Sequence, residues 1–114
     1  MLSKELMAAS TRPLILTILI SGESYGYEII QEVKKLSGGS LEWSDGMLYP
    51  VLNKLRNEGL IESRWEISPE GRKRKYYSIT VKGQEELEVA KHQWMNIHDV
   101  FVQVWGPTPQ WSLN

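Results

Sequence analysis

The chain has 114 residues, of which 41% are hydrophobic, and a formal net charge of −1. That length fits a single domain with a modest core, and the absence of cysteine excludes disulfides and thiolate metal sites. No apolar run is long enough to span a bilayer and no secretory leader is recognisable, so we expect a cytoplasmic protein without a membrane partner.

The basic charge is concentrated in one part of the chain. Residues 60–83 hold six Lys or Arg against three acidic residues, whereas residues 84–114 hold Lys91 against four acidic residues. A local basic segment is enough to bind phosphates, so the small net charge does not exclude nucleic acid as a partner.

The first predicted element is an apolar helix that ends near Ser21. Six large aliphatic residues between positions 14 and 20 indicate that this helix is covered on most sides. Proline is tolerated in the first turn of a helix, so Pro13 leaves two alternatives. Either the helix begins just before Pro13, or a longer helix from about Ser3 kinks there.

The next two predicted elements are also helices. One is predicted between an N-cap at Ser24 and a stop at Gly38-Gly39. Ser44 is the predicted N-cap of the other, which ends at Gly59. Helical spacing predicts that the buried side of this third helix consists of Leu48, Val51, Leu52 and Leu55.

The exposed side of the third helix is the predicted recognition surface for duplex DNA, because a short helix of this kind fits the major groove. Pro50 removes a backbone hydrogen bond to Gly46, a cost that a purely structural helix would be expected to avoid. Tyr49 could be a partly buried core residue, but its place between Leu48 and Val51 turns it outward, toward phosphates or base edges. The predicted contact residues are Ser44, Gly46, Tyr49, Pro50, Asn53 and Lys54. The last two could also be ordinary surface residues.

A β-hairpin with a basic turn is predicted after the third helix. Alternation places one set of side chains on a shared face, continued by Tyr77 and Ile79 on the return strand, and puts the turn at Ser68–Gly71. That shared face consists of Ile61, Ser63, Trp65 and Ile67. The cations of the turn are Arg72, Lys73, Arg74 and Lys75. Alone, this run could be a solvated turn, but beside a recognition helix we expect it to bind DNA phosphates.

The last predicted element is a long helix that Thr80 caps and Gly106-Pro107 ends. Its apolar residues are spaced 3, 4, 3, 4, 3, which is a heptad seam. The helix would be roughly 36 Å long at about 1.5 Å per residue, so much of the seam needs a second copy of the chain to cover it. The predicted dimerisation residues are Leu87, Ala90, Trp94, Ile97, Phe101 and Val104.

These elements predict a mainly α fold with a small β-hairpin, namely a winged helix-turn-helix followed by a long C-terminal dimerisation helix. We expect residues 1–80 to form the DNA-binding domain and residues 81–106 the dimerisation helix, and we assign no structure to the tail at residues 107–114.

Several of the motifs resemble those of the PadR family of bacterial transcriptional regulators. The most specific are Leu48-Tyr49-Pro50, Gly59-Leu60-Ile61, the run from Arg72 to Tyr77, and Thr80 with Gly83. The resemblance covers roughly residues 4–105, and the single C-terminal helix is similar to that of the short subfamily, which includes multidrug-binding repressors. It implies a homodimeric repressor that binds a palindromic operator and is released by an aromatic or phenolic small molecule.

Trp94 is too bulky for tight packing at the seam of a two-stranded coiled coil. It could simply fill the core of the dimer. Alternatively, one Trp94 from each subunit could line an apolar slot that accepts flat aromatic molecules. The resemblance to multidrug-binding members favours the slot, and implies that Leu6, Ala9, Ile97 and His98 complete its walls.

Enzymatic and metal chemistry find little support in the sequence. His92 and His98 have no third ligand at useful spacing, and no nucleophile is paired with a base, so we expect neither a metal, a cofactor nor an enzyme. The alternative to a DNA-binding regulator is a winged-helix module used only for protein association. Such a module would be expected to have lost the cations of its hairpin turn.

Overall fold

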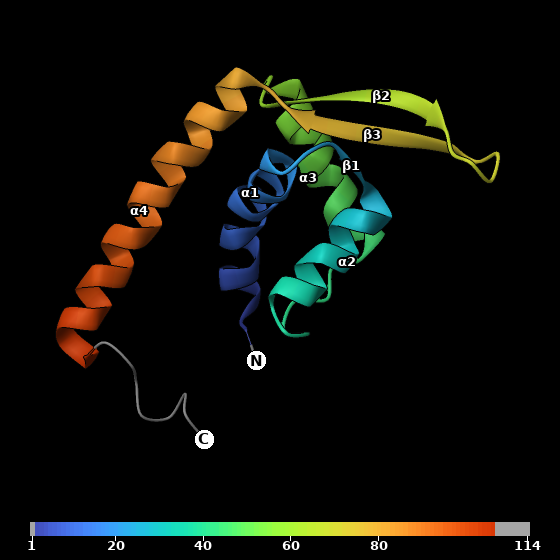
Figure 1. Cartoon of the computed structure of the whole chain (residues 1–114). Helices are drawn as coiled ribbons and strands as arrows, with labels where there is room; N and C mark the ends of the chain where they lie inside the picture. Colours follow the sequence, from blue (N-terminus) through green and yellow to red (C-terminus); the bar gives the residue numbers. More distant parts are fainter. Residues whose placement is uncertain (1, 107–114) are drawn as a thin grey trace.

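The computed structural model describes residues 2–106, which form four helices and three strands. These are α1 (Lys4–Ile20), β1 (Ser24–Tyr25), α2 (Gly26–Leu36), α3 (Asp45–Asn57), β2 (Ile61–Ile67), β3 (Lys73–Ile79) and α4 (Val81–Trp105). Figure 1 shows α1, α2 and α3 packed together, with the β2–β3 hairpin projecting to one side and α4 leaving toward the other. The predicted fold class is confirmed, and the predicted tail lies outside the described residues.

The sheet contains one more strand than the predicted hairpin, in the order β1-β3-β2. Ser24 and Tyr25 pair antiparallel with Tyr77 and Tyr76. The prediction that Ser24 is the N-cap of the second helix is therefore wrong. Tyr25 holds that position, without a side-chain hydrogen bond. The Ser24 hydroxyl instead donates to the Glu28 carboxylate over 2.6 Å.

The first helix is the longer of the two predicted alternatives and runs without interruption through Pro13. Its N-terminus is capped by Ser3, whose Oγ accepts a hydrogen bond of 3.2 Å from the Leu6 N–H. Its buried residues face the core, while Ile20 at its end is exposed, so the helix is covered on most but not all sides.

The core joins all four helices to the first half of the hairpin. It includes Ile15 and Leu16 of α1, Ile29 of α2, Leu52 of α3 and Leu87 of α4. The early part of α4 thus belongs to the core of the winged body.

The start of α4 lies against the chain just before β2. A Cβ at Gly83 would overlap the carbonyl oxygen of Leu60, so only glycine allows this approach. We expect Gly83→Ala to destabilise the fold by about 2 kcal/mol or more, because backbone cannot move aside as a flexible side chain can. Urea unfolding would measure the loss. Gly46→Ala is the control, since a Cβ there would meet only the Ser44 hydroxyl, at 3.9 Å. Equal stability of the two variants would contradict this packing.

An ion-pair cluster connects α1 with the end of α3 and the start of α4. The Arg12 guanidinium of α1 lies 2.9 Å from the carboxylate of Glu58, at the end of α3, and 2.9 Å from that of Glu86, on α4. The Arg12 guanidinium holds the pKa of the Glu58 carboxyl below its ordinary value, and Lys82 donates to the Glu58 carbonyl over 2.9 Å. These bonds fix the end of α3 relative to the start of α4.

Candidate nucleic-acid interface

The third helix presents one apolar and one polar side, as predicted. Ser44 caps it by accepting a hydrogen bond of 3.2 Å from the Met47 N–H. Leu48, Leu52 and Leu55 are fully buried, which turns the opposite side outward. All six predicted contact residues are exposed on this chain: Ser44, Gly46, Tyr49, Pro50, Asn53 and Lys54.

Tyr49 is 39% exposed, and its ring lies against the first residue of α2. A Cβ at Gly26 would overlap the Tyr49 hydroxyl, so a larger residue at this position would displace the Tyr49 side chain. Burial, with a smaller contribution from Asp45, raises the pKa of the Tyr49 hydroxyl. Burial thus favours the neutral hydroxyl, which can donate a hydrogen bond.

The hairpin leaves the winged body about halfway along its length. Tyr77 is buried opposite Ser63, but beyond this pair Trp65 is 57% and Ile67 is 72% exposed. The predicted shared face is therefore an inner face only up to Ser63. The predicted turn is confirmed by hydrogen bonds of 2.7 Å from Ser68 N–H to the Arg72 carbonyl and 2.9 Å from Gly71 N–H to the Ser68 carbonyl.

Strand alternation divides the basic run between the two faces of the hairpin. Lys73 and Lys75 lie on the face of Trp65, with their Nζ atoms 5.0 and 5.6 Å from the indole centroid. The Arg74 guanidinium lies 4.4 Å from the Tyr25 ring centroid and pairs with Glu70 over 3.4 Å. The two lysines have no such ion pair among the described residues.

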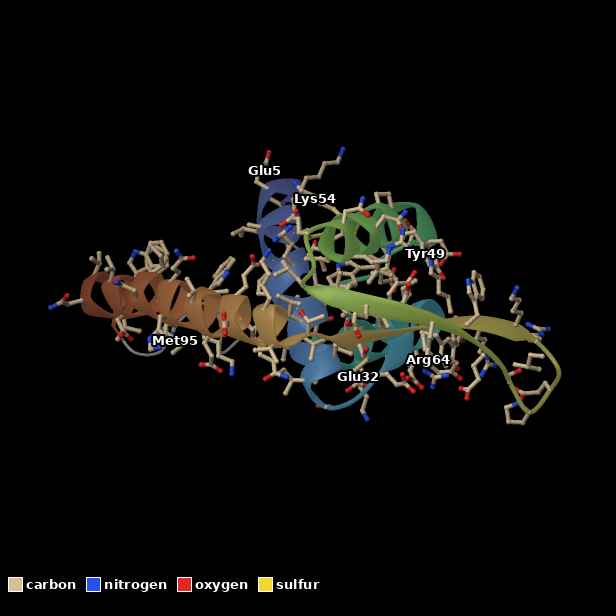
Figure 2. All side chains as sticks on the ribbon, turned by 90° about the horizontal axis from the view of Figure 1, so that it is seen from above. Glu5, Glu32, Tyr49, Lys54, Arg64 and Met95 are labelled. Carbon is tan, nitrogen blue, oxygen red and sulfur yellow. The ribbon has the colours of Figure 1, made fainter. Side chains whose placement is uncertain are left out.

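The opposite face of the hairpin carries compensated charge. Arg64 pairs there with Glu23, at 3.0 Å from Nε to Oε2, and with Glu66 at 3.3 Å. Figure 2 shows Tyr49 and Arg64 on opposite sides of the hairpin. The face that looks toward α3 is thus the one with uncompensated cations.

A groove of about 790 Å³ runs between the hairpin, α3 and the start of α2, and we call it the wing groove. It brings together six of the ten residues predicted to bind DNA, while Ser44, Gly46, Pro50 and Lys54 lie outside it. Its lining residues are Tyr25, Gly26, Tyr27, Tyr49, Asn53, Trp65, Arg72, Lys73, Arg74, Lys75 and Tyr77. The sequence-based prediction missed the aromatic members Tyr25, Tyr27 and Trp65. Alternation had placed Trp65 on the same face as the buried Ile61, and it gave no sign that this face becomes exposed beyond Ser63.

The predicted seam on α4 requires one correction. Leu87 is only 1% exposed and belongs to the core of the single chain, so it does not line an open seam. Among the residues of the predicted seam, exposure begins at Trp94, which is 41% exposed. Trp105, which the heptad pattern did not include, stacks on Phe101 with 4.4 Å between ring centroids. The exposed apolar face of α4 consists of Trp94, Ile97, Phe101, Val104 and Trp105.

The predicted ligand-binding residues do not come together within one chain. Trp94 lines a cavity of about 310 Å³ between α1 and α4, whose axes diverge in Figure 1. The other residues around this cavity are Ser10, Pro13, Leu14, Thr17, Leu87, Lys91 and Met95. The predicted wall residues Leu6, Ala9, Ile97 and His98 are exposed and do not line it.

Neither a membrane span nor a metal cluster is found in the part of the chain that the structure describes. None of its helices combines the length and apolar character needed to cross a bilayer, and no three metal-ligating side chains converge.

The family model described as "Transcriptional regulator PadR-like family" matches residues 15–89, from the middle of α1 into α4. The chain belongs to this family. PadR-like proteins are transcriptional regulators and not enzymes, as the sequence predicted.

One named regulator and two solved regulators are similar to the chain over most of its length. The negative transcriptional regulator PadR of Bacillus subtilis is 34% identical over 84 residues, which cover 74% of this chain and 44% of the relative. The chain thus spans less than half of that regulator. The crystal structure of a PadR-like regulator from Bacillus cereus is 32% identical, with a TM-score of 0.79, and covers 92% of this chain and 100% of that one. A transcriptional regulator from Clostridium thermocellum is 25% identical, with a TM-score of 0.81 over 90% of this chain and 97% of that one.

Proposed function

We propose that the chain is a dimeric, ligand-responsive repressor that binds a palindromic operator and is released by aromatic small molecules. The observation that carries the DNA-binding part is the wing groove, which is lined by Tyr49 and Asn53 of α3 together with the four cations of the hairpin. In this proposal residues 1–80 bind DNA and residues 81–106 dimerise. Because such a regulator acts on chromosomal DNA, we also propose that the protein is cytoplasmic.

The charge distribution favours DNA over a protein partner for this surface. Lys73 and Lys75 lack ion-pair partners among the described residues, whereas Arg64 on the other face has two. Uncompensated cations beside an exposed helix suit a polyanion, because each phosphate that they neutralise releases a counterion. Repression as the mode of action rests on the similarity to the negative regulator of Bacillus subtilis.

Dimerisation is supported by the exposed apolar face of α4. Isolated exposed apolar residues are common in monomers, but a contiguous set along one helix face marks an interaction site. A second copy of the same helix covers such a face symmetrically, and a two-fold dimer presents two copies of α3 to two half-sites.

A gel shift with duplex DNA from upstream of the chain's own gene tests the DNA assignment. We expect a complex at low salt that weakens steeply as salt is raised and that resists an excess of random duplex. No shift at low salt would favour the alternative, a winged-helix module that only associates with proteins.

We expect flat aromatic compounds to bind against Trp94 between two subunits. Stacking on an indole recovers apolar area that the divergent helices leave open, so Trp94→Ala should weaken binding about tenfold or more. Calorimetric titration with planar dyes is the measurement, because Trp43, Trp65, Trp105 and Trp111 also fluoresce. Trp65→Ala, far from α4, is the matched control. If Trp94→Ala remains dimeric and binds the dyes as tightly as wild type, Trp94 is only a core residue of the dimer.

A further inference from the structure

Trp65 is an exposed indole in the projecting half of the hairpin, and phosphate neutralisation by cations does not account for it. More than half of its surface is open to solvent, and Ile67 on the same strand face is also exposed. Exposed large apolar side chains that gather at one place indicate a contact surface. Trp65 moreover lines the wing groove, whereas Ile67 does not.

The register of the hairpin places the two uncompensated lysines around this indole. Lys75 is the cross-strand partner of Trp65, and Lys73 is the partner of Ile67, so Lys73 is diagonal to the indole. Both ammonium groups lie within 6 Å of the ring centroid, as cation–π contacts require. The ring and the two charges therefore occupy one patch.

Across the groove from this patch lie further aromatic rings. Tyr49 of α3 and Tyr27 of α2 line the opposite side, together with Asn53. The groove thus combines cations with aromatic ring surface. A sugar–phosphate strand has the complementary composition, because anionic phosphates alternate along it with apolar faces of deoxyribose.

The position of the groove indicates which part of the duplex would occupy it. If α3 enters the major groove and the hairpin tip reaches past its edge, the sugar–phosphate strand that borders the major groove must pass between them. The wing groove is the space between α3 and the hairpin. Resting on the proposed function, we propose that the Trp65 indole packs on deoxyribose of this strand, beside the phosphates that Lys73 and Lys75 neutralise.

This contact differs in its physical signature from those of the cations and of α3. An apolar contact with sugar releases no counterions, so it contributes affinity that does not depend on salt. Because every nucleotide of the strand carries the same sugar, the contact also contributes equally to cognate and random sequences.

The test uses the full-length protein and a duplex of about 30 base pairs that the wild type selects from a random pool, a length that holds two half-sites. Trp65→Ala is expected to weaken binding about tenfold to both selected and random duplex, while the slope of log affinity against log salt stays at the wild-type value. Trp65→Phe is expected to retain most of the affinity. Lys73→Ala with Lys75→Ala should instead lower the slope, by up to about 1.8 for each wing bound.

Leu36→Ala is the matched control, because Leu36 is as exposed as Trp65 but lies outside the groove. Hydroxyl-radical footprinting gives a second readout that does not depend on affinity. The wild type and Trp65→Phe should protect a short run of sugars in each half-site that Trp65→Ala leaves exposed.

Wild-type affinity for Trp65→Ala, or the same footprint, would overturn this inference and leave the proposed function intact. A lowered salt slope for Trp65→Ala would also overturn it, since the indole would then act only by holding the two lysines. A wild type that binds no duplex would overturn the proposed function, and this contact with it.

Discussion

Replacing Arg72, Lys73, Arg74 and Lys75 by alanine is expected to weaken DNA binding on the order of a hundredfold or more at moderate salt, because four phosphate-neutralising charges are lost from each wing. The loss should be similar for cognate and random duplex. The slope of log affinity against log salt should fall by up to about 3.6 for each wing bound, and titrations at several salt concentrations measure both effects.

The four cations are not expected to contribute equally. Arg74 already lies over the Tyr25 ring and pairs with Glu70, so its release toward a phosphate costs existing contacts. Lys73 and Lys75 would lose only their cation–π contacts with the Trp65 indole. We therefore expect Lys75→Ala to weaken binding more than Arg74→Ala.

Arg64→Ala provides a control with the same change in charge. Arg64 lies on the opposite face of the hairpin and is held by Glu23 and Glu66. Arg64→Ala should therefore lower the affinity for DNA much less than Lys75→Ala does. If the quadruple variant binds DNA with wild-type affinity and salt dependence, the DNA assignment of the hairpin is wrong.

The sequence predicted the helices well because each has local signals that act over a few residues. Ser44 and Thr80 cap α3 and α4 as expected, through hydrogen bonds to the third residue of each helix. The misassigned cap at Ser24 has a physical reason, since Ser24 is held in β1 by pairing with Tyr77. A strand of two residues has no period that a sequence pattern can show.

The candidate sites were predicted less completely, because periodicity gives the faces of an element but not where its neighbours end. Alternation put Trp65 and Ile61 on one face correctly, yet only the three-dimensional structure shows that Ile61 is buried and Trp65 is open. In the same way, the heptad spacing continued from Leu87 to Trp94 without a break. The first of these residues packs inside its own chain and the second does not.

This division of α4 decides how dimerisation is best tested. Truncation before Leu87 would remove a core residue and unfold the winged body, so loss of DNA binding would then say nothing about assembly. Substitutions on the exposed apolar face leave the core intact. Ile97 and Phe101 are both exposed and lie on the same side of α4 as Trp94.

Ile97→Glu with Phe101→Glu is therefore expected to give a folded monomer whose operator affinity falls about 100-fold to 10,000-fold, because the two half-sites can no longer be bound at once. Light scattering measures the mass, and a gel shift measures the affinity. Asn96→Asp with Gln103→Glu adds the same two charges on the opposite side of α4 and should remain dimeric. A wild type that is monomeric at micromolar concentration, or a double-Glu variant that still dimerises, would show that the apolar face of α4 is not the dimer interface.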